Sequence, residues 1–235
     1  MRIALIGYGK MGQEIERLLN VDKKHEVVSI SYKKETDTLD LDKIKGADVA
    51  IDFTSPEIVL KNIQSIAKLG ISMVVGTTGW EKEMKKVEDI VTKNDIGLIY
   101  GGNFSIGANI FFQITKFASK LFSKYDSFYD VYGSEIHHQW KKDSPSGTAK
   151  KLSDIIVKNF PAKKKPDDLN FSSVRGGVNP GRHEITFDSA ADEVALIHQA
   201  HNRQGFAKGA ILAAEFIHGK KGLYRFEELF EKGNL

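Results

Sequence analysis

The stretch that decides the fold lies at residues 1–19, which read MRIALIGYGKMGQEIERLL. The apolar run Ile3 to Ile6 predicts a β-strand, and the helical spacing of apolar residues from Gln13 to Leu19 predicts a helix directly after it. Between them lies Gly7-Tyr8-Gly9-Lys10-Met11-Gly12, which is G-x-G-x-x-G in a strand–turn–helix setting. This arrangement is typical of a Rossmann-type domain that binds a dinucleotide.

Each glycine of this loop has its own physical role. Gly7 permits the tight turn, Gly9 lets the backbone approach a pyrophosphate, and Gly12 lets the helix pack close to the strand. The N–H groups and the positive dipole end of the helix would then hold the phosphates. A glycine-rich turn in an unrelated sheet is the alternative. The expected cofactor-binding residues of the loop are Gly7, Tyr8, Gly9, Lys10, Met11 and Gly12.

Strand and helix patterns alternate through the first hundred residues. Further strands are expected at 27–30, 48–53, 71–75 and 96–100, and further helices at 58–69 and 81–93. Alternation of this kind implies right-handed crossovers and a doubly wound parallel sheet that is covered on both faces.

The pattern changes after residue 103. A helix is expected at 106–125, with one apolar face formed by Ile110, Phe111, Ile114, Phe117, Ala118 and Leu121. Further helices are expected at 148–160 and 206–218, and strands at 129–136, 171–175, 183–188 and 193–200. The strands lack the earlier crossover rhythm, so we expect a second, α+β domain with a mixed or antiparallel sheet. The expected domains are 1–103 with 204–235 for the dinucleotide and 104–203 for substrate binding and oligomerisation.

Composition excludes several classes of protein. The 235 residues include no cysteine, so there is no disulfide framework, thiol nucleophile or cysteine-based metal site. The net charge of +3 is too even for a protein that coats nucleic acid. No apolar run is long enough to span a membrane, and no signal peptide is recognised. We therefore expect a cytoplasmic protein with neither nucleic-acid nor membrane partners.

Further turns follow the expected parallel strands at 52–56, 76–80 and 101–105. Cofactors lie across the carboxyl ends of strands in such sheets, where small residues allow close approach. Three such turns on one sheet edge favour a nicotinamide pocket there.

The end of the second strand bears on the choice of cofactor. A carboxylate that binds the ribose 2′-OH is expected there for NAD, but Lys33 and Lys34 stand in its place, followed by Glu35. Two cations would attract a 2′-phosphate, so the sequence favours NADPH over NADH. Two solvated surface lysines are the alternative.

The stretch at 135–149, EIHHQWKKDSPSGTA, carries the candidate chemistry. Histidine suits proton transfer near neutral pH, lysine can donate a proton or bind a carboxylate, and the start of a helix forms an anion site. The segment therefore offers an acid, a cation and a carboxylate cradle. A structural histidine pair is one alternative. Metal ligation is another, which is disfavoured because adjacent His137 and His138 point to opposite faces of a strand.

The sequence resembles the 4-hydroxy-tetrahydrodipicolinate reductase (dihydrodipicolinate reductase) family. The resemblance is carried by E-I-H-H-x-x-K-x-D-S-P-S-G-T-A at 135–149, I-D-F-T-x-P-E at 51–57, V-G-T-T-G-W at 75–80 and G-N-F-S-I-G at 102–107. The glycine loop and the segment V-R-G-G at 174–177 also fit, so the resemblance extends over nearly the whole chain.

The resemblance implies a cytoplasmic homotetramer that reduces a small cyclic imine dicarboxylate with NADPH or NADH, in the diaminopimelate route to lysine. It implies His137 as the proton donor and acceptor and Lys141 as a proton donor. It places the substrate on His138, Ser146, Gly147 and Thr148, with no metal. The further cofactor contacts that it implies are Phe53, Gly76, Thr77, Thr78, Gly102, Asn103, Phe104 and Ser105.

Two departures from the family pattern concern the cofactor side. Many members carry an acidic-basic pair where this chain has Lys33 and Lys34, and the span from Lys34 to Asp48 is short. Two other functions compete with the reductase. Another nicotinamide enzyme, such as an aspartate or homoserine dehydrogenase, would lack the stretch at 135–149, and a dinucleotide sensor without enzymatic activity would need neither His137 nor Lys141.

Overall fold

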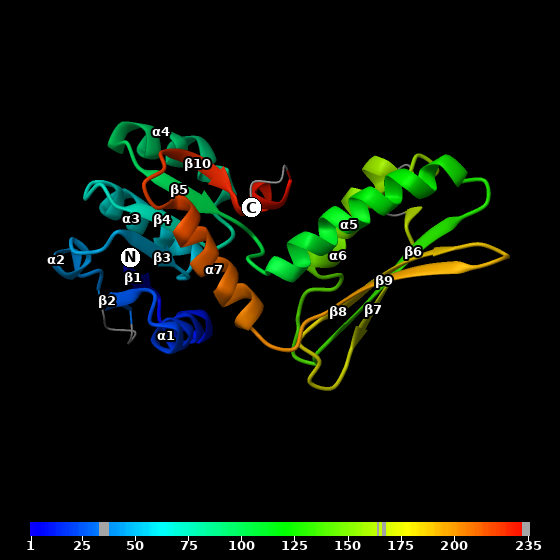
Figure 1. Cartoon of the computed structure of the whole chain (residues 1–235), viewed down its shortest axis with the longest axis horizontal. Helices are drawn as coiled ribbons and strands as arrows, with labels where there is room; N and C mark the ends of the chain where they lie inside the picture. Colours follow the sequence, from blue (N-terminus) through cyan, green and yellow to red (C-terminus); the bar gives the residue numbers. More distant parts are fainter. Residues whose placement is uncertain (33–37, 164, 166–167, 232–235) are drawn as a thin grey trace. The chain divides into compact units, whose positions relative to one another are not determined.

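The computed structural model of the chain describes residues 1–32, 38–163, 165 and 168–231. These residues form two compact units (Figure 1). Unit 1 comprises Met1–Ile106 with Arg203–Leu235, and unit 2 comprises Gly107–Asn202. Unit 1 therefore takes residues from both ends of the chain. No helix among the described residues is long and apolar enough to cross a membrane.

Unit 1 is built on a parallel sheet of six strands in the order β10-β5-β4-β3-β1-β2. The strands are β1 (Arg2–Ile6), β2 (Glu26–Ser31), β3 (Val49–Asp52), β4 (Ser72–Val75), β5 (Gly97–Tyr100) and β10 (Gly222–Arg225). From β1 the chain extends the sheet first to β2 on one side and then through β3 to β10 on the other. This order confirms the expected doubly wound α/β fold.

Helices cover both faces of this sheet. The helices are α1 (Lys10–Asp22), α2 (Leu41–Ile44), α3 (Pro56–Ala67), α4 (Met84–Asn94) and α7 (Gln204–Ile217), with 3₁₀ turns at Glu81–Glu83 and Phe226–Phe230. Ile3 and Leu5 of β1 pack in a core with α1 and α7, whereas Ala4 and Ile6 pack in a second core with α3 and α4. Since both faces are buried, the strands read as continuous apolar runs, which is why the sequence predicted them.

Two elements of unit 1 are absent from the sequence prediction. The sheet was expected to have five strands, but β10 pairs with β5 in parallel as a sixth. Its sequence, GLYR, is short and contains glycine and a charged residue, so it lacks the apolar run of a central strand. The four-residue helix α2 is too short to show a helical period.

Helix α7 packs tightly on unit 1, as expected for the helix at 206–218. A Cβ at Gly209 would lie 1.8 Å from the carbonyl oxygen of Phe104. The ring of Phe104 is buried and packs 4.6 Å, centroid to centroid, from the ring of Phe226. Glycine in α7 therefore permits the close approach of the helix to the loop that follows β5.

Unit 2 is an α+β unit with a mixed sheet in the order β7-β6-β8-β9. Its strands are β6 (Asp130–His137), β7 (Phe171–Arg175), β8 (Arg182–Asp188) and β9 (Glu193–Gln199), and its helices are α5 (Ile106–Phe122) and α6 (Gly147–Asn159), with a 3₁₀ turn at Ser123–Tyr125. The pair β6 and β7 is parallel, and the other two pairs are antiparallel. This confirms the expected mixed sheet. The core lies between the sheet and the two helices.

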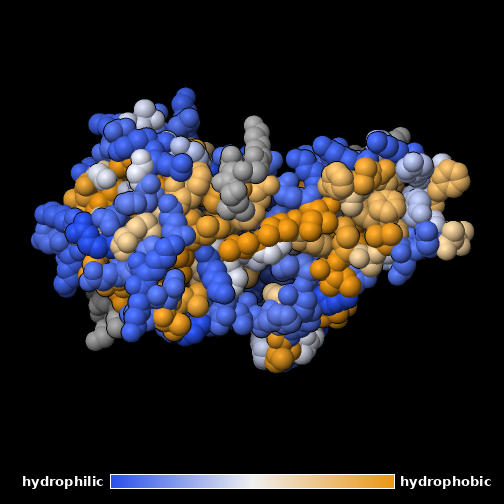
Figure 2. Space-filling model, viewed as in Figure 1, coloured by the Kyte–Doolittle hydropathy of each residue, from blue (hydrophilic) through white to orange (hydrophobic). Residues whose placement is uncertain are grey.

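The expected apolar face of the helix at 106–125 was partly wrong. Phe111 is buried and Ala118 packs against the core, but the other four residues form a separate, exposed stripe. Ile110, Ile114, Phe117 and Leu121 are between 44% and 65% exposed. The side of α5 that meets the core carries Ala108, Asn109, Phe111, Phe112, Thr115 and Ser119. Figure 2 shows hydrophobic residues along the outer side of α5.

The close packing of α7 gives a stability prediction. We expect Gly209→Ala to lower the free energy of unfolding by about 2 kcal/mol, because the new Cβ would overlap the Phe104 carbonyl. Gly205→Ala in the same helix is the control, since its Cβ would lie 3.6 Å from Ser105 Oγ, an ordinary contact. Urea unfolding followed by circular dichroism measures both, and equal midpoints for the two variants would contradict the close packing.

Candidate active site

The glycine loop of unit 1 has the geometry that a dinucleotide cradle requires. Gly7 has φ +92°, a left-handed conformation, and a Cβ there would lie 2.5 Å from the Phe53 carbonyl oxygen. A Cβ at Gly12 would lie 2.3 Å from the Gly7 carbonyl oxygen, so α1 approaches β1 as closely as glycine allows. At Gly9, where α1 begins, a Cβ would meet no atom of the described residues within 4 Å. The loop thus leaves open space at the glycine expected to face a pyrophosphate.

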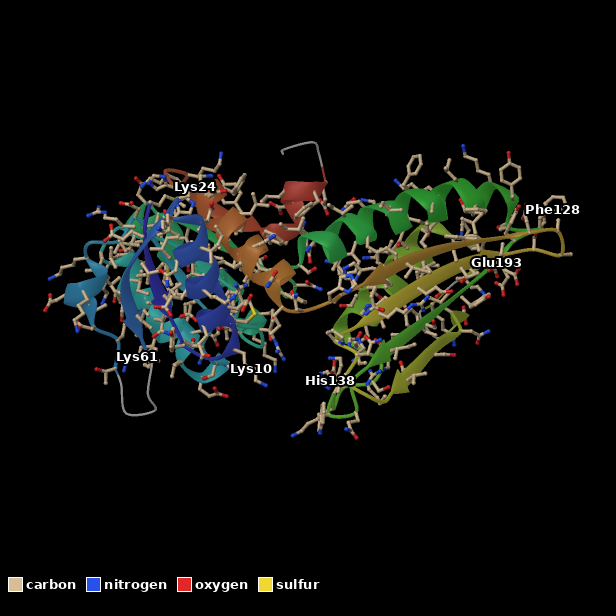
Figure 3. All side chains as sticks on the ribbon, turned by 60° about the horizontal axis from the view of Figure 1, so that its bottom comes forward. Lys10, Lys24, Lys61, Phe128, His138 and Glu193 are labelled. Atoms are coloured by element: carbon tan, nitrogen blue, oxygen red, sulfur yellow. The ribbon has the colours of Figure 1, made fainter. Side chains whose placement is uncertain are left out.

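The side chains of the loop have different surroundings. The Tyr8 hydroxyl donates a hydrogen bond to the Glu16 carboxylate, and Lys10 is exposed at the start of α1 (Figure 3). The described residues therefore fit a nucleotide whose phosphates lie over the start of α1. Lys33 and Lys34, expected at the 2′-phosphate, lie outside the described residues.

A buried carboxylate organises the neighbouring turns of unit 1. Asp52, at the end of β3, is fully buried and accepts hydrogen bonds from Thr54 N at 2.9 Å, Asn62 Nδ2 at 2.8 Å and Thr77 Oγ1 at 3.2 Å. Burial raises the pKa of Asp52, although these hydrogen bonds oppose the rise. Asp52 thereby joins the turn after β3 to α3 and to the turn after β4.

The expected cofactor residues of these turns are brought to one sheet edge. Gly76 and Phe53 are in contact, since a Cβ at Gly76 would overlap the Phe53 ring. Thr77 is buried with its hydroxyl bonded to Asp52, and Thr78 is exposed. In the turn after β5, Asn103 Oδ1 accepts from Ser105 N at 2.9 Å. Phe104 belongs to the core, so its ring supports the turn from inside.

In unit 2, strand register assembles a buried polar cluster at one end of the sheet. Glu135 and His137 lie two residues apart on β6, so their side chains share a face. Glu135 pairs with Ser173 on β7 and with His183 on β8, and His137 pairs with Arg175. Figure 3 shows His138, the next residue along, at the end of the unit opposite Phe128 and Glu193.

Glu135 is the centre of the cluster. Its Oε1 accepts hydrogen bonds from Ser146 N at 3.0 Å, Ser173 Oγ at 2.7 Å and Arg175 Nη2 at 2.8 Å. Burial opposes ionisation of this fully buried carboxyl, but these hydrogen bonds outweigh it and lower the pKa of Glu135 to about 2. Glu135 is therefore a carboxylate at neutral pH.

Two histidines face the other oxygen of this carboxylate. The Nε2 atoms of His137 and His183 each lie 3.3 Å from Glu135 Oε2 and 3.3 Å from each other. Burial lowers the pKa of both rings, to about 4 for His183, where the nearby His137 lowers it further. The charge of Glu135 opposes the shift in both. The His183 ring is therefore held largely neutral at pH 7.

The other expected site residues surround this cluster. The Ser146 hydroxyl caps α6, accepting from Ala149 N at 3.1 Å, and lies 3.2 Å from His183 Nε2. Gly147 and Thr148 begin α6, and within the described ranges of the chain a Cβ at Gly147 would meet no atom within 4 Å. Lys141 Nζ donates to Asp143 Oδ1 at 2.7 Å, and its charge contributes to lowering the pKa of His137.

His138 lies outside the cluster of Glu135, His137 and His183. Its backbone N–H donates to the Asn179 carbonyl oxygen at 2.8 Å, and its ring lies 5.8 Å, centroid to centroid, from that of the exposed Trp140. The adjacent histidines therefore have different surroundings. Within the described residues, one group of three His, Asp or Glu side chains is close enough to share a metal ion, and it consists of Glu135, His137 and His183.

Sequence reasoning missed Glu135, His183 and Asp52 as parts of the two sites. Glu135 could have been found, because its spacing of two residues from His137 puts both on one face of a strand. His183 is 46 residues from His137 and reaches it through antiparallel pairing, which no sequence pattern specifies.

Comparison with known proteins follows the same division of the chain. Residues 1–104 match the family described as dihydrodipicolinate reductase, N-terminus, and residues 107–230 match its C-terminus. The chain belongs to the dihydrodipicolinate reductase family. It is similar to the 4-hydroxy-tetrahydrodipicolinate reductase of Christiangramia forsetii, with 36% identity over 97% of each chain, and to that of Methanocaldococcus jannaschii, with 33% identity over 94% of this chain and 78% of the relative.

A solved structure agrees with this assignment. The dipicolinate-bound dihydrodipicolinate reductase from Paenisporosarcina sp. TG-14 has a TM-score of 0.82 and 25% identity, over 97% of this chain and 99% of that one. Diaminopimelate dehydrogenase from C. glutamicum, at 10% identity and a TM-score of 0.55, shares the fold alone. Membership of the family makes the chain an NAD(P)H-dependent oxidoreductase that acts in the diaminopimelate route to lysine.

The lowered pKa of the buried His183 predicts how the stability of the folded protein depends on pH. The pKa of His183 is about 4 in the folded state and near 6.5 when unfolded, so the unfolded chain binds more protons between these values. We expect the contribution of His183 to the free energy of unfolding to be fully present above pH 6.5. This contribution should fall by about 3 kcal/mol as the pH is lowered to 4. Unfolding by urea at several pH values measures this.

The variant His183→Gln should flatten this dependence, because it removes the titrating ring. His218→Gln, at an exposed histidine, is the control and should leave the wild-type slope in place. A His183→Gln slope as steep as that of the wild type would contradict the assignment of the pH dependence to His183.

Proposed function

We propose that the end of β6 and the start of α6 bind a small cyclic imine dicarboxylate, and that His137 transfers the proton in its reduction. The observation that carries this proposal is the position of His137, at the end of β6 with the ionised Glu135 behind it. A histidine so placed can carry a proton, because the carboxylate stabilises its imidazolium form, and can deliver that proton to a substrate.

The start of α6 suits the carboxylates of the substrate. Gly147 and Thr148 are its first residues, where helix N–H groups and the helix dipole favour an anion. The open space at Gly147 leaves room for a carboxylate to approach the backbone. His138 and Lys141 supply nearby side chains that can donate hydrogen bonds to a dianion. Dipicolinate, the dicarboxylate bound to the Paenisporosarcina relative, has the chemistry that such a site would recognise.

The reaction divides between cofactor and protein. The nicotinamide, when bound, supplies the hydride. His137 then donates a proton to the atom that holds the new electron pair, a step worth about 10²–10⁴-fold in rate. Lys141, held by Asp143 next to His137, stabilises negative charge on the substrate and assists the proton transfer.

This proposal predicts different kinetic effects for the two residues. His137→Gln should lower kcat by about 10²–10⁴-fold, because the proton donor is lost. Lys141→Ala should raise KM for the cyclic substrate about tenfold or more, because substrate charge is left unpaired. The assay follows loss of NADPH absorbance with the aldol product of pyruvate and aspartate semialdehyde.

Lys142→Ala is the matched control for these variants, since Lys142 is the exposed neighbour of Lys141. It should behave as the wild type. Values of kcat and KM within a factor of about three of wild type in both His137→Gln and Lys141→Ala would overturn the proposed roles.

We also propose that the loops of unit 1 bind the cofactor and that NADPH is preferred. Support comes from the open Gly9 and the tight Gly7 and Gly12, and from the turns organised by Asp52. Phe53, Gly76, Thr77 and Thr78 would line this edge through their backbone and exposed atoms, together with Gly102, Asn103 and Ser105, while Phe104 would support it from the core. Lys33 and Lys34 would attract the 2′-phosphate.

The cofactor preference has its own test. Replacing both Lys33 and Lys34 by Ala should raise KM for NADPH about tenfold and leave KM for NADH unchanged, because only NADPH carries the 2′-phosphate. Lys93→Ala is the control, since Lys93 is exposed shortly before β5 begins. It therefore lies near the end of the sheet where the parallel strands start, away from the turns proposed to bind the cofactor. Equal KM values for the two cofactors, unaffected by the double substitution, would contradict the preference.

We further propose that the protein works as a cytoplasmic homotetramer. The exposed stripe of α5 and the exposed Val194 and Ile197 of β9 are apolar surfaces that self-association would cover. Both apolar surfaces belong to unit 2, which corresponds to the segment expected to form the oligomer interface.

A further inference from the structure

The two oxygens of Glu135 have unequal surroundings. Oε1 accepts three hydrogen bonds, whereas Oε2 is buried and makes none of ordinary geometry with the residues that the structure describes. The nearest groups to Oε2 on the side of the histidines are the Nε2 atoms of His137 and His183, both at 3.3 Å. A buried carboxylate oxygen requires donors. The two imidazole Nε2 atoms, which also lie 3.3 Å from each other, are near enough to supply a donor to this oxygen.

The buried position of His183 identifies which of its nitrogens carries the proton. Its Nδ1 is buried and has no hydrogen-bond partner in the described part of the chain, so an N–H there would have no acceptor among those residues. Its Nε2 faces Glu135 Oε2 and lies 3.2 Å from Ser146 Oγ, and both oxygens can accept. His183 is therefore a neutral ring with the proton on Nε2. It places one donor on the free oxygen of Glu135.

The His137 ring presents its Nε2 to the same oxygen. Gly181 packs against the Cε1 edge of the ring, where a Cβ would lie 2.9 Å from His137 Cε1, 3.3 Å from Nδ1 and 3.7 Å from Nε2. Gly181 has φ +150°, and its N–H is held by Asn179 Oδ1 at 2.9 Å. The ring is thus confined between the carboxylate and a residue that must lack a side chain. Its Nδ1 is the nitrogen directed away from Glu135 and His183.

We propose that Glu135 and His183 are positioning residues that keep the proton of neutral His137 on Nε2 and make Nδ1 the nitrogen that delivers the catalytic proton. This inference rests on the proposed role of His137 as proton donor. The ring enters the step as an imidazolium, the Nδ1–H bond breaks, and the proton bonds to the substrate atom that holds the new electron pair. The ring is left neutral with Nε2–H donated to Glu135, nothing in the ring is oxidised or reduced, and solvent returns the proton.

His183 has a specific part in this arrangement. With Glu135 Oε2 and the Ser146 hydroxyl both within reach of its Nε2, it connects the carboxylate behind His137 to the cap of α6. Since α6 begins with the proposed carboxylate cradle, His183 ties the proton donor to the element that holds the substrate. Loss of His183 should therefore affect the chemical step more than substrate binding.

The first test determines which ring nitrogen of His137 and of His183 carries the proton. Protein labelled with ¹⁵N in its seven histidine rings shows by long-range ¹H–¹⁵N correlation which nitrogen carries the proton, and His137→Gln and His183→Gln spectra assign the two signals. At a pH where both rings are neutral, we expect the proton on Nε2 of each. A proton on Nδ1 of His137 would overturn the proposal, whatever the activity.

The second test compares two substitutions of His183. His183→Leu removes the donor and should lower kcat about tenfold or more, with KM for the cyclic substrate within about twofold of wild type. His183→Gln returns an N–H donor and should recover most of this loss. Equal kcat values for Leu and Gln, or a Leu variant as active as wild type, would overturn the role of His183. If the Leu variant fails to fold, the spectrum and the Gln variant still decide.

A third test separates proton positioning from metal binding by the same three residues. Treatment with EDTA should leave the His137 and His183 ring signals unchanged. Signals that change with EDTA and return with zinc would show a metal site and overturn the proposal. Failure of the proposed function is distinguished by His137→Gln: if that variant keeps the wild-type kcat, the proton-donor role itself is wrong, and the ring spectra still report the tautomer.

Discussion

A carboxylate without access to solvent has to be supplied with donors by its own protein, and in unit 2 this need shapes the whole candidate site. Glu135 takes its hydrogen-bond donors from β7 and from the turn before α6, and His183 of β8 lies 3.3 Å from its second oxygen. The groups that surround this one buried charge therefore constrain where α6 begins and where Arg175 and His183 lie. His137 receives its environment from this arrangement, because the charge behind it is held in place by the neighbouring elements.

Unit 1 uses a buried carboxylate in a related way. Asp52 joins the turns after β3 and β4 and the helix α3 through neutral donors, and burial raises its pKa. Glu135 has an arginine, one backbone N–H and one hydroxyl as donors, and its pKa is lowered to about 2. A buried carboxylate thus joins the turns at the sheet edge proposed to bind the cofactor, and another holds a fixed charge at the site proposed for proton transfer. The difference lies in the partners.

Much of the fold could be predicted because local patterns report burial. The four inner strands of unit 1 are mostly apolar, since helices cover both of their faces, and the edge strand β2 was predicted from its apolar stretch at 27–30. The edge strand β10 escaped prediction because an edge strand needs less apolar sequence. The buried face of helix α5 was predicted incorrectly because the helix carries two apolar stripes. Its local sequence does not indicate which of them meets the core.

By itself the sequence determined the glycine loop, the alternation of strands and helices, and the placement of His137, Lys141 and the small residues of α6 in one segment. These features depend on residues close together in the chain, where backbone geometry links spacing to position. Only the tertiary structure decided that His183 and Arg175 join Glu135, and that Ser146 serves as a cap. Those contacts depend on which residues face each other across strands, and that register follows from packing of the whole sheet rather than from any local pattern.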